Sequence, residues 1–167
     1  GVRGDRATPG EFRRTQNWIG PAGCGVENAT FVPPPVDELI ACLDQWESFL
    51  HDRTLPPLLQ AGMLHVQFET IHPFLDGNGR LGRLLMTLVL VAEGVLREPL
   101  LYLSLYLKAH RSLYYEHLQR VRTDGDWEGW LEFLVIGIRE TALQAVATAQ
   151  ELAQLRRIDR DDIRVLA

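Results

Sequence analysis

The chain has few cysteines and no long hydrophobic run. Cys24 and Cys42 show neither the spacing of a metal site nor the density of a disulfide scaffold, so we expect free thiols in a reducing compartment. The longest apolar stretch, residues 84–92, is too short to cross a bilayer, and no signal peptide is visible. These absences favour a cytoplasmic protein that has no membrane partner.

The sequence also lacks a surplus of basic residues, and it contains no internal repeats. The formal net charge is −5, which argues against nucleic acid as a partner of this domain. With 167 residues, 46% of them apolar, the chain is long enough to bury one hydrophobic core. We therefore expect a single domain over residues 1–167. Because the chain starts without a methionine, we interpret it as a fragment of a longer protein.

The hydrophobic spacing predicts an all-α fold with one small β element. Residues 1–35 are rich in glycine and proline and should be mostly irregular, with short strands at 16–19 and 30–32 that pair as a hairpin. Residues 36–155 should form the helical core, and residues 156–167 a helix end or linker. Helices in the core are predicted over 36–50, 57–71, 80–93, 105–122 and 127–155. The third of these is apolar nearly all round, as expected at the centre of a bundle.

One run of twelve residues, 72–83, reads HPFLDGNGRLGR and holds the inventory of a phosphate site. The N-terminus of the following helix offers free N–H groups to an anion, and Gly77 and Gly79 let a phosphate approach the backbone. Arg80 and Arg83 lie on one face of that helix, and their planar guanidinium groups suit phosphate oxygens.

The same run holds an acid and a base. Asp76 would repel phosphates unless a cation lay between them, and Mg²⁺ binds carboxylate and phosphate oxygens together. His72 follows the preceding helix and can act as a general base at neutral pH. Each element alone could be an ordinary turn or a solvated helix face, but a turn needs neither a base nor paired arginines. Residues 77–82 also read G-x-G-x-x-G, yet the strand that a dinucleotide fold requires before this pattern is missing, and no P-loop sequence is present.

The run resembles the signature of the Fic family, H-x-F-x-D/E-G-N-G-R-x-x-R, at every specified position. The resemblance implies an all-α Fic-type bundle with a small hairpin flap near the N-terminus. It also implies a protein adenylyltransferase, which moves AMP from ATP onto a Ser, Thr or Tyr hydroxyl of a target protein and releases pyrophosphate. In that mechanism His72 deprotonates the hydroxyl and Asp76 holds Mg²⁺. The phosphates are bound by Gly77, Asn78, Gly79, Arg80 and Arg83.

Two further segments resemble the family. Residues 10–20 look like the flap that pairs with the backbone of the target, and residues 31–35 look like its return. Residues 111–118 resemble the segment whose tyrosine lines the adenine pocket, and the sequence does not choose between two adjacent tyrosines. The residues implied in this way are Trp18, Ile19 and Gly20 at the target groove, and Tyr115 or Tyr114 at the adenine.

The motif leaves alternatives open. The same fold could remove AMP from a modified protein or transfer another nucleotide or phosphate-bearing group. A non-catalytic nucleotide-binding regulatory module is an alternative of another class. The inhibitory pattern S/T-x-x-x-E-G/N of many Fic proteins is missing from the sequence, so we expect an uninhibited fragment. Its expected partners are ATP and an unknown target protein, with any inhibitory segment or antitoxin-like partner lying outside this chain.

Two side chains near the motif are expected to be structural. His65 lies seven residues before His72, too far along the helix to share a metal ion, and should be packed and hydrogen-bonded. By the resemblance, Phe74 should point into the core and steady the loop.

Overall fold

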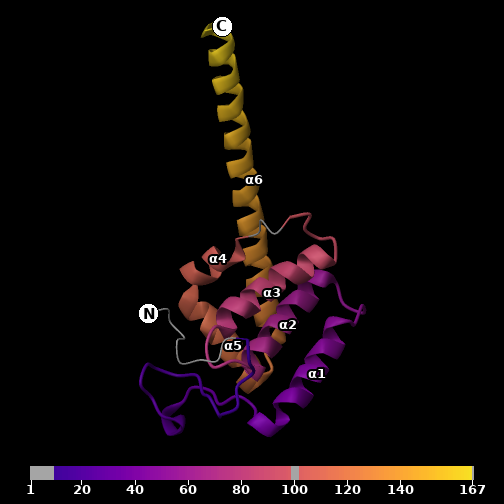
Figure 1. Ribbon diagram of the computed structural model, residues 1–167, viewed down its shortest axis with the longest axis vertical. Coiled ribbons are helices and arrows are strands. Elements are labelled where there is room, and N and C mark those ends of the chain that lie inside the picture. Colours follow the sequence, from indigo (N-terminus) through magenta and orange to yellow (C-terminus); the bar gives the residue numbers. More distant parts are fainter. Residues whose placement is uncertain (1–9, 99–101, 167) are drawn as a thin grey trace.

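Six α-helices make up most of the described chain (Figure 1). The computed structural model describes residues 10–98 and 102–166, with side chains as far as Ile158. The helices are α1 (Leu39–Leu50), α2 (Pro57–Ile71), α3 (Asn78–Ala92), α4 (Leu103–Ala109), α5 (Arg111–Asp124) and α6 (Trp127–Leu166), and the 3-10 turns η1 (Val26–Asn28) and η2 (Val36–Glu38) precede them. The protein is therefore all-α, as predicted.

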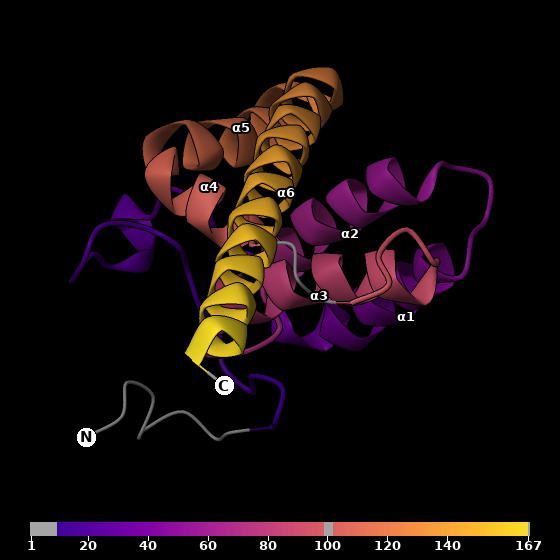
Figure 2. The same cartoon turned by 90° about the horizontal axis from the view of Figure 1, so that it is seen from above.

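The α2–α3 pair forms the centre of the molecule. The two helices pack along one another, α1 covers α2 from one side, and α6 crosses between the α2–α3 pair and the α4–α5 pair (Figure 2). Two hydrophobic clusters fill the space between them. One cluster joins α2 and α3 to α4, α5 and α6 around Trp130 and Leu134, and the other joins them to α1 around Leu64 and Leu90.

Both ends of α2 agree with the predicted range of 57–71. The helix begins at Pro57, where a missing N–H group costs nothing, and ends at Ile71 because Pro73 disfavours helical geometry in the residue before it. Gly62 in the middle of α2 lets α6 approach closely, and the Trp130 indole donates a hydrogen bond of 3.0 Å to the Gly62 carbonyl. The end of α2 is thus fixed both by local sequence and by packing.

Several predicted element bounds were wrong. The helix expected over 105–122 is two helices, because the chain bends at His110, whose ring packs on Tyr106 with centroids 4.2 Å apart. The motif helix begins at Asn78 instead of residue 80, and the last helix runs to Leu166 instead of 155. The expected hairpin is a single antiparallel bridge between Ile19 and Phe31, and no longer ladder forms in the described ranges.

The motif helix, α3, is buried on one face only. Its residues Met86, Val89 and Leu90 lie in the core, but Leu84 and Leu88 are 51% and 46% exposed. The prediction of a helix surrounded on all sides is therefore wrong, because α3 packs mainly along α2 and leaves the face with Leu84 and Leu88 exposed.

The last helix, α6, projects far beyond the rest of the molecule (Figure 1). Its 40 residues span about 60 Å. Its first part is packed as far as Thr141, while every residue from 142 to 158 is exposed. Throughout the described part of the chain, no helix has the length and hydrophobicity needed to span a membrane.

Candidate active site

His72, the first residue after α2, has a left-handed backbone with φ 48° and ψ 60°. Elsewhere in the described ranges, positive φ angles occur only at glycines. This conformation costs a residue with a side chain on the order of 1–3 kcal/mol and persists only where its surroundings hold it. It turns the chain sharply between α2 and the loop that leads to α3.

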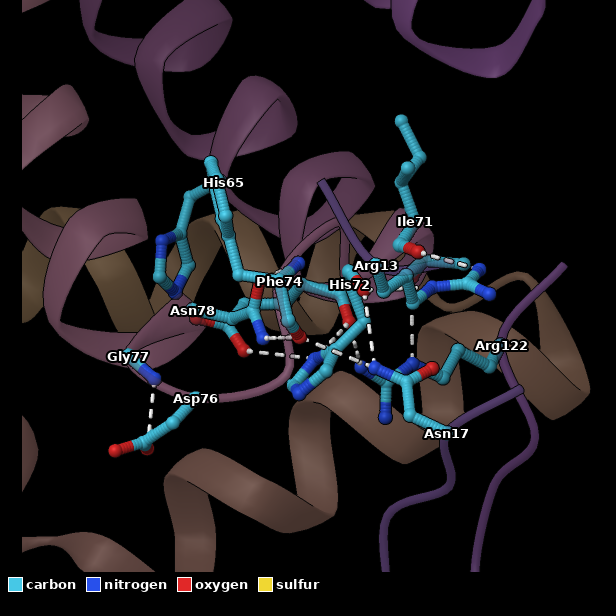
Figure 3. Close-up of polar contacts among 12 residues, drawn as sticks. Arg13, Asn17, His65, Ile71, His72, Phe74, Asp76, Gly77, Asn78 and Arg122 are labelled. Atoms are coloured by element: carbon cyan, nitrogen blue, oxygen red, sulfur yellow. Dashed lines mark hydrogen bonds and ion pairs between the residues drawn. The ribbon is translucent and has the colours of Figure 1, made fainter. Parts of the chain in front are cut away.

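Two side chains from the N-terminal segment hold this turn (Figure 3). Arg13 is buried, and its Nε donates a hydrogen bond of 3.1 Å to the His72 carbonyl, while its backbone N–H bonds the Pro73 carbonyl at 2.8 Å. Asn17 donates from Nδ2 to the carbonyls of His72 and Phe74, at 3.2 and 3.1 Å. The strained turn thus depends on residues more than fifty positions away in the sequence.

The imidazole of His72 is held in one tautomer. Its Nδ1 lies 3.3 Å from the Glu69 carbonyl, which can only accept, so Nδ1 carries the proton. The lone pair is then on Nε2. Burial lowers the pKa of His72 to about 4, so the ring is neutral at pH 7 and able to accept a proton.

The loop between α2 and α3 is closed by the side chain of Asn78. Its Oδ1 accepts from the Phe74 N–H at 2.9 Å and its Nδ2 donates to the Phe74 carbonyl at 2.7 Å. Asn78 is buried and its side chain is bonded within the loop. Asn78 can therefore offer an anion only its backbone N–H. Phe74 itself is half-buried and packs on Phe12, with ring centroids 5.4 Å apart, so the expectation that it enters the core was wrong.

The first turn of α3 has the form of an anion site. Gly77 has φ 88°, which favours glycine, and the N–H groups that follow lack partners within the helix. A Cβ at Gly79 would lie 3.1 Å from the Arg83 guanidinium, so glycine gives that arginine room to fold back over the turn. Arg80 is exposed, and its Nη2 lies 3.5 Å from the Asp76 carboxylate.

Asp76 fits a magnesium ion shared with a phosphate. One of its oxygens accepts from the Gly77 N–H at 2.7 Å, and its side chain is 46% exposed (Figure 3). In the described ranges, no group of three acids, histidines or cysteines could hold a metal by protein ligands alone. Mg²⁺ is commonly coordinated by one or two carboxylates, with phosphate oxygens and water as its other ligands. A single exposed carboxylate beside an anion site fits that coordination.

A cavity of about 340 Å³ lies beside Arg83. Both candidate tyrosines line it, but they differ in their contacts. Tyr114 is buried, and its hydroxyl lies 2.9 Å from His65 Nε2, whereas Tyr115 is half-exposed. The other lining residues are Ser104, Leu105, Leu107, Lys108 and Arg111.

His65 is structural, as predicted. It is fully buried, stacks on Trp130 with centroids 5.7 Å apart, and is kept neutral because burial lowers its pKa to about 4.

The segment expected to be the flap lies next to the turn at His72. The N–H and carbonyl groups of Ile19 and Phe31 exchange hydrogen bonds of 2.8 and 3.1 Å, and the Trp18 indole donates to the Cys24 carbonyl at 2.8 Å. Arg122 from α5 lies over the Phe31 ring at 4.2 Å and donates to the Glu69 carbonyl at 3.1 Å. The flap and the last turn of α2 are therefore joined through one arginine.

Comparison with known proteins shows to which family the chain belongs. The sequence profile of the Fic/DOC family matches residues 3–90, more than half of the chain, and includes the whole of the run from His72 to Arg83. The chain belongs to the Fic/DOC family.

Similar Fic proteins are known from insects and bacteria. The protein adenylyltransferase Fic of Aedes aegypti is 35% identical over 128 residues, which cover 75% of this chain and 22% of that protein. The Drosophila melanogaster protein of the same name is 34% identical, with 75% and 23% covered. The chain thus spans less than a quarter of the length of these relatives.

Solved Fic structures share the fold. A Fic family protein from Desulfovibrio desulfuricans G20 superposes with a TM-score of 0.71 at 28% identity, over 83% of this chain and 41% of that one. Fic-1 from C. elegans gives a TM-score of 0.63 at 25% identity, over 86% and 38% of the two chains.

Sequence reasoning missed three residues at this Fic site. Arg13 and Asn17 fall in a segment predicted to be irregular, where no periodicity marks a buried side chain. Glu69 left a signal, because His65, Glu69 and His72 recur at i, i+4 and i+7 on a helix that is otherwise largely apolar.

Proposed function

We propose that this chain transfers AMP from ATP to a hydroxyl group of a target protein. The observation that carries the proposal is the position of His72, a neutral imidazole with Nε2 free, six residues before the N-terminus of a helix that can bind phosphate. A site that only binds a nucleotide has no need of a base held in one tautomer. The names of the insect relatives, protein adenylyltransferase, support the same activity.

Two neighbouring features would bind the nucleotide. Its phosphates would lie on the free N–H groups of Asn78 and Gly79, with Gly77, whose own N–H bonds Asp76, allowing close approach, and would be bound by Arg80 and Arg83. The adenine would enter the cavity next to Arg83, where Tyr115 is the better candidate for a ring contact because the hydroxyl of Tyr114 is already bonded to His65.

The transfer step moves one proton and one group. The target hydroxyl gives its proton to His72 Nε2 while its oxygen forms a bond to the α-phosphorus. The bond from that phosphorus to the bridging oxygen breaks, and pyrophosphate leaves. Mg²⁺ held by Asp76, when bound, would offset the negative charge on the phosphates.

The target protein would lie along Trp18, Ile19 and Gly20. These residues border the turn at His72 because Asn17, directly before them, donates to its carbonyl. An extended target segment can pair with backbone groups at such an edge and bring its hydroxyl to the base. We place the reaction in the cytoplasm, where both cysteines would remain free thiols.

A label-transfer assay tests the function. Protein would be incubated in cell lysate with Mg²⁺ and ATP labelled at the α-phosphate in one arm and at the γ-phosphate in the other. We expect labelled target protein from the α position only, and a loss of about 10²–10⁴-fold in His72→Ala, the usual share of a general base. Label from the γ position would indicate a kinase, and equal labelling by His72→Ala would remove His72 from the mechanism.

A further inference from the structure

A buried carboxyl group lies behind the catalytic imidazole and has no role in the mechanism above. Glu69 is 6% exposed, and its Oε2 lies 4.0 Å from His72 Nδ1, on the side of the ring opposite the lone pair. Its other oxygen, Oε1, is buried and has no hydrogen-bond partner in the described part of the chain. A buried carboxyl without a partner is costly, so its presence calls for a reason.

The neighbouring helix is shaped to admit this carboxyl. A Cβ added at Gly82 of α3 would lie 2.9 Å from Glu69 Oε1 and 3.1 Å from His65 Nδ1. A Cβ at Gly79 would lie 3.6 Å from the same oxygen. Gly82 therefore leaves the space in which Glu69 sits, at the contact between α2 and α3, while the distance at Gly79 is an ordinary van der Waals contact.

The charged groups around Glu69 come from several elements. Arg122 on α5 donates to the Glu69 backbone carbonyl, and Arg83 on α3 acts on the carboxyl at longer range. His65 and Tyr114, which contact each other, complete the set on the buried side. In the described ranges, the His72 ring nitrogen is the single basic side-chain nitrogen within 4.0 Å of the Glu69 carboxylate, and the two form an ion pair only when the ring is protonated. Burial outweighs the two arginines and raises the pKa of Glu69 to about 7.

We propose that Glu69 is a positioning residue for His72, whose carboxylate stabilises the imidazolium formed when the ring takes the proton of the target hydroxyl. This inference rests on the proposed function. In the step, the hydroxyl proton moves to Nε2, Nδ1 keeps its own proton, and the positive ring faces the carboxylate across 4.0 Å. The proton passes to water after pyrophosphate leaves, and no group is oxidised or reduced.

The pH dependence of transfer follows from the same pair. Above pH 7 Glu69 is a carboxylate beside a neutral imidazole, which is the active form. As the pH falls through about 7 Glu69 takes up a proton, the counter-charge is lost, and transfer declines. The rate should therefore rise across neutral pH with Glu69 as the titrating group.

Glu69→Gln tests the proposal, because it removes the charge but keeps the size of the side chain. The backbone carbonyl of residue 69, which accepts from His72 Nδ1, also remains. We expect kcat to fall by about tenfold or more with KM for ATP within about twofold, and the rising limb near pH 7 to disappear. The matched control is Glu93→Gln, which removes a carboxylate paired with Arg53 and should leave the profile unchanged. A purely packing role for Glu69 would leave the shape of the pH profile as in the wild type, and that result would overturn the proposal.

A second measurement does not depend on activity. Ring nitrogen shifts of His72 followed by NMR should show a step near pH 7 in the wild type that is absent from Glu69→Gln. Identical curves in both proteins would contradict the proposal even if AMP transfer is confirmed, and a lost step would support it even if no target is labelled. If Glu69→Gln does not fold, Glu69→Asp keeps the charge but withdraws it from Nδ1, and it should weaken the same step. An unchanged step in that variant would overturn the proposal.

Discussion

His72 has a backbone conformation that stores on the order of 1–3 kcal/mol, and the donors on its carbonyl offset that cost. Arg13 and Asn17 both bond this single oxygen, at 3.1 and 3.2 Å. Removing a donor leaves the turn free to relax, and the imidazole moves with it. Because a displacement of about 1 Å at a reacting group can cost 10²-fold in rate, we expect these contacts to be needed for the proposed transfer.

Asn17→Ala tests this coupling. The change removes two hydrogen bonds, to the His72 and Phe74 carbonyls, and should lower the free energy of unfolding by about 1–3 kcal/mol. AMP transfer should fall by about 10–100-fold, while ATP affinity, measured by calorimetry, stays near the wild-type value. Asn28→Ala, the same change at an exposed position of η1, is the control. Wild-type transfer in Asn17→Ala would show that the turn holds without it.

The signature residues could be predicted because they lie within twelve consecutive positions. Their helix-end context follows from Pro73 and the two glycines, and the structure brings them to one place. Asn78 shows the limit of that inference. It was predicted among the phosphate-binding residues, but its side chain bonds both backbone groups of Phe74. A buried amide needs hydrogen-bond partners, and here the loop provides them, so the side chain is not available to a ligand.

At the scale of elements, α2 and α3 meet through glycine. Gly82 lies against Glu69 and His65 of α2, and a methyl group there would approach both side chains to about 3 Å. Gly82→Ala gains about 1 kcal/mol of helix propensity but loses about 1–3 kcal/mol to overpacking. We expect the free energy of unfolding to fall by about 1–2 kcal/mol in urea titrations.

Transfer activity should also fall in Gly82→Ala, because the displaced carboxyl and the first turn of α3, where we propose that phosphate binds, share this contact. Ser112→Ala, on the exposed face of α5, is the control and should leave both stability and activity unchanged. A variant of Gly82 with wild-type stability would show that the two helices can separate without loss.

The elements themselves were predictable to different degrees. The bounds of α2 follow from proline at each end, and they were predicted correctly. The break between α4 and α5 was not, because His110 carries no glycine or proline signal. Its bend is set by the Tyr106 ring and by a hydrogen bond of 3.0 Å from its own Nδ1 to the Tyr106 carbonyl. Tertiary and side-chain contacts of this kind leave no mark in hydrophobic periodicity.

At the scale of the whole molecule, α6 has two unlike halves. Its packed part contributes Trp130, Phe133 and Leu134 to the core, while residues 142–158 touch no core. Most of the stability of a helix in a protein comes from the packing of one face, and the outer half of α6 lacks such packing. Backbone amides of 146–158 should therefore exchange at least about tenfold faster than those of 131–141 when followed by hydrogen–deuterium exchange mass spectrometry. Equal protection along the helix would show that a second molecule covers its outer half, and protection would then depend on protein concentration.

The bonds from Arg13 and Asn17 to the His72 carbonyl also bear on how such proteins are recognised. All twelve signature positions can be present in a chain whose N-terminal segment has changed, and nothing in those twelve positions would report the loss. A search that scores the signature alone would therefore not distinguish an active protein from one that has lost the contacts holding His72. We expect activity in this fold to depend on two parts of the sequence: the signature, and an arginine and an asparagine some fifty-five to sixty residues before His72.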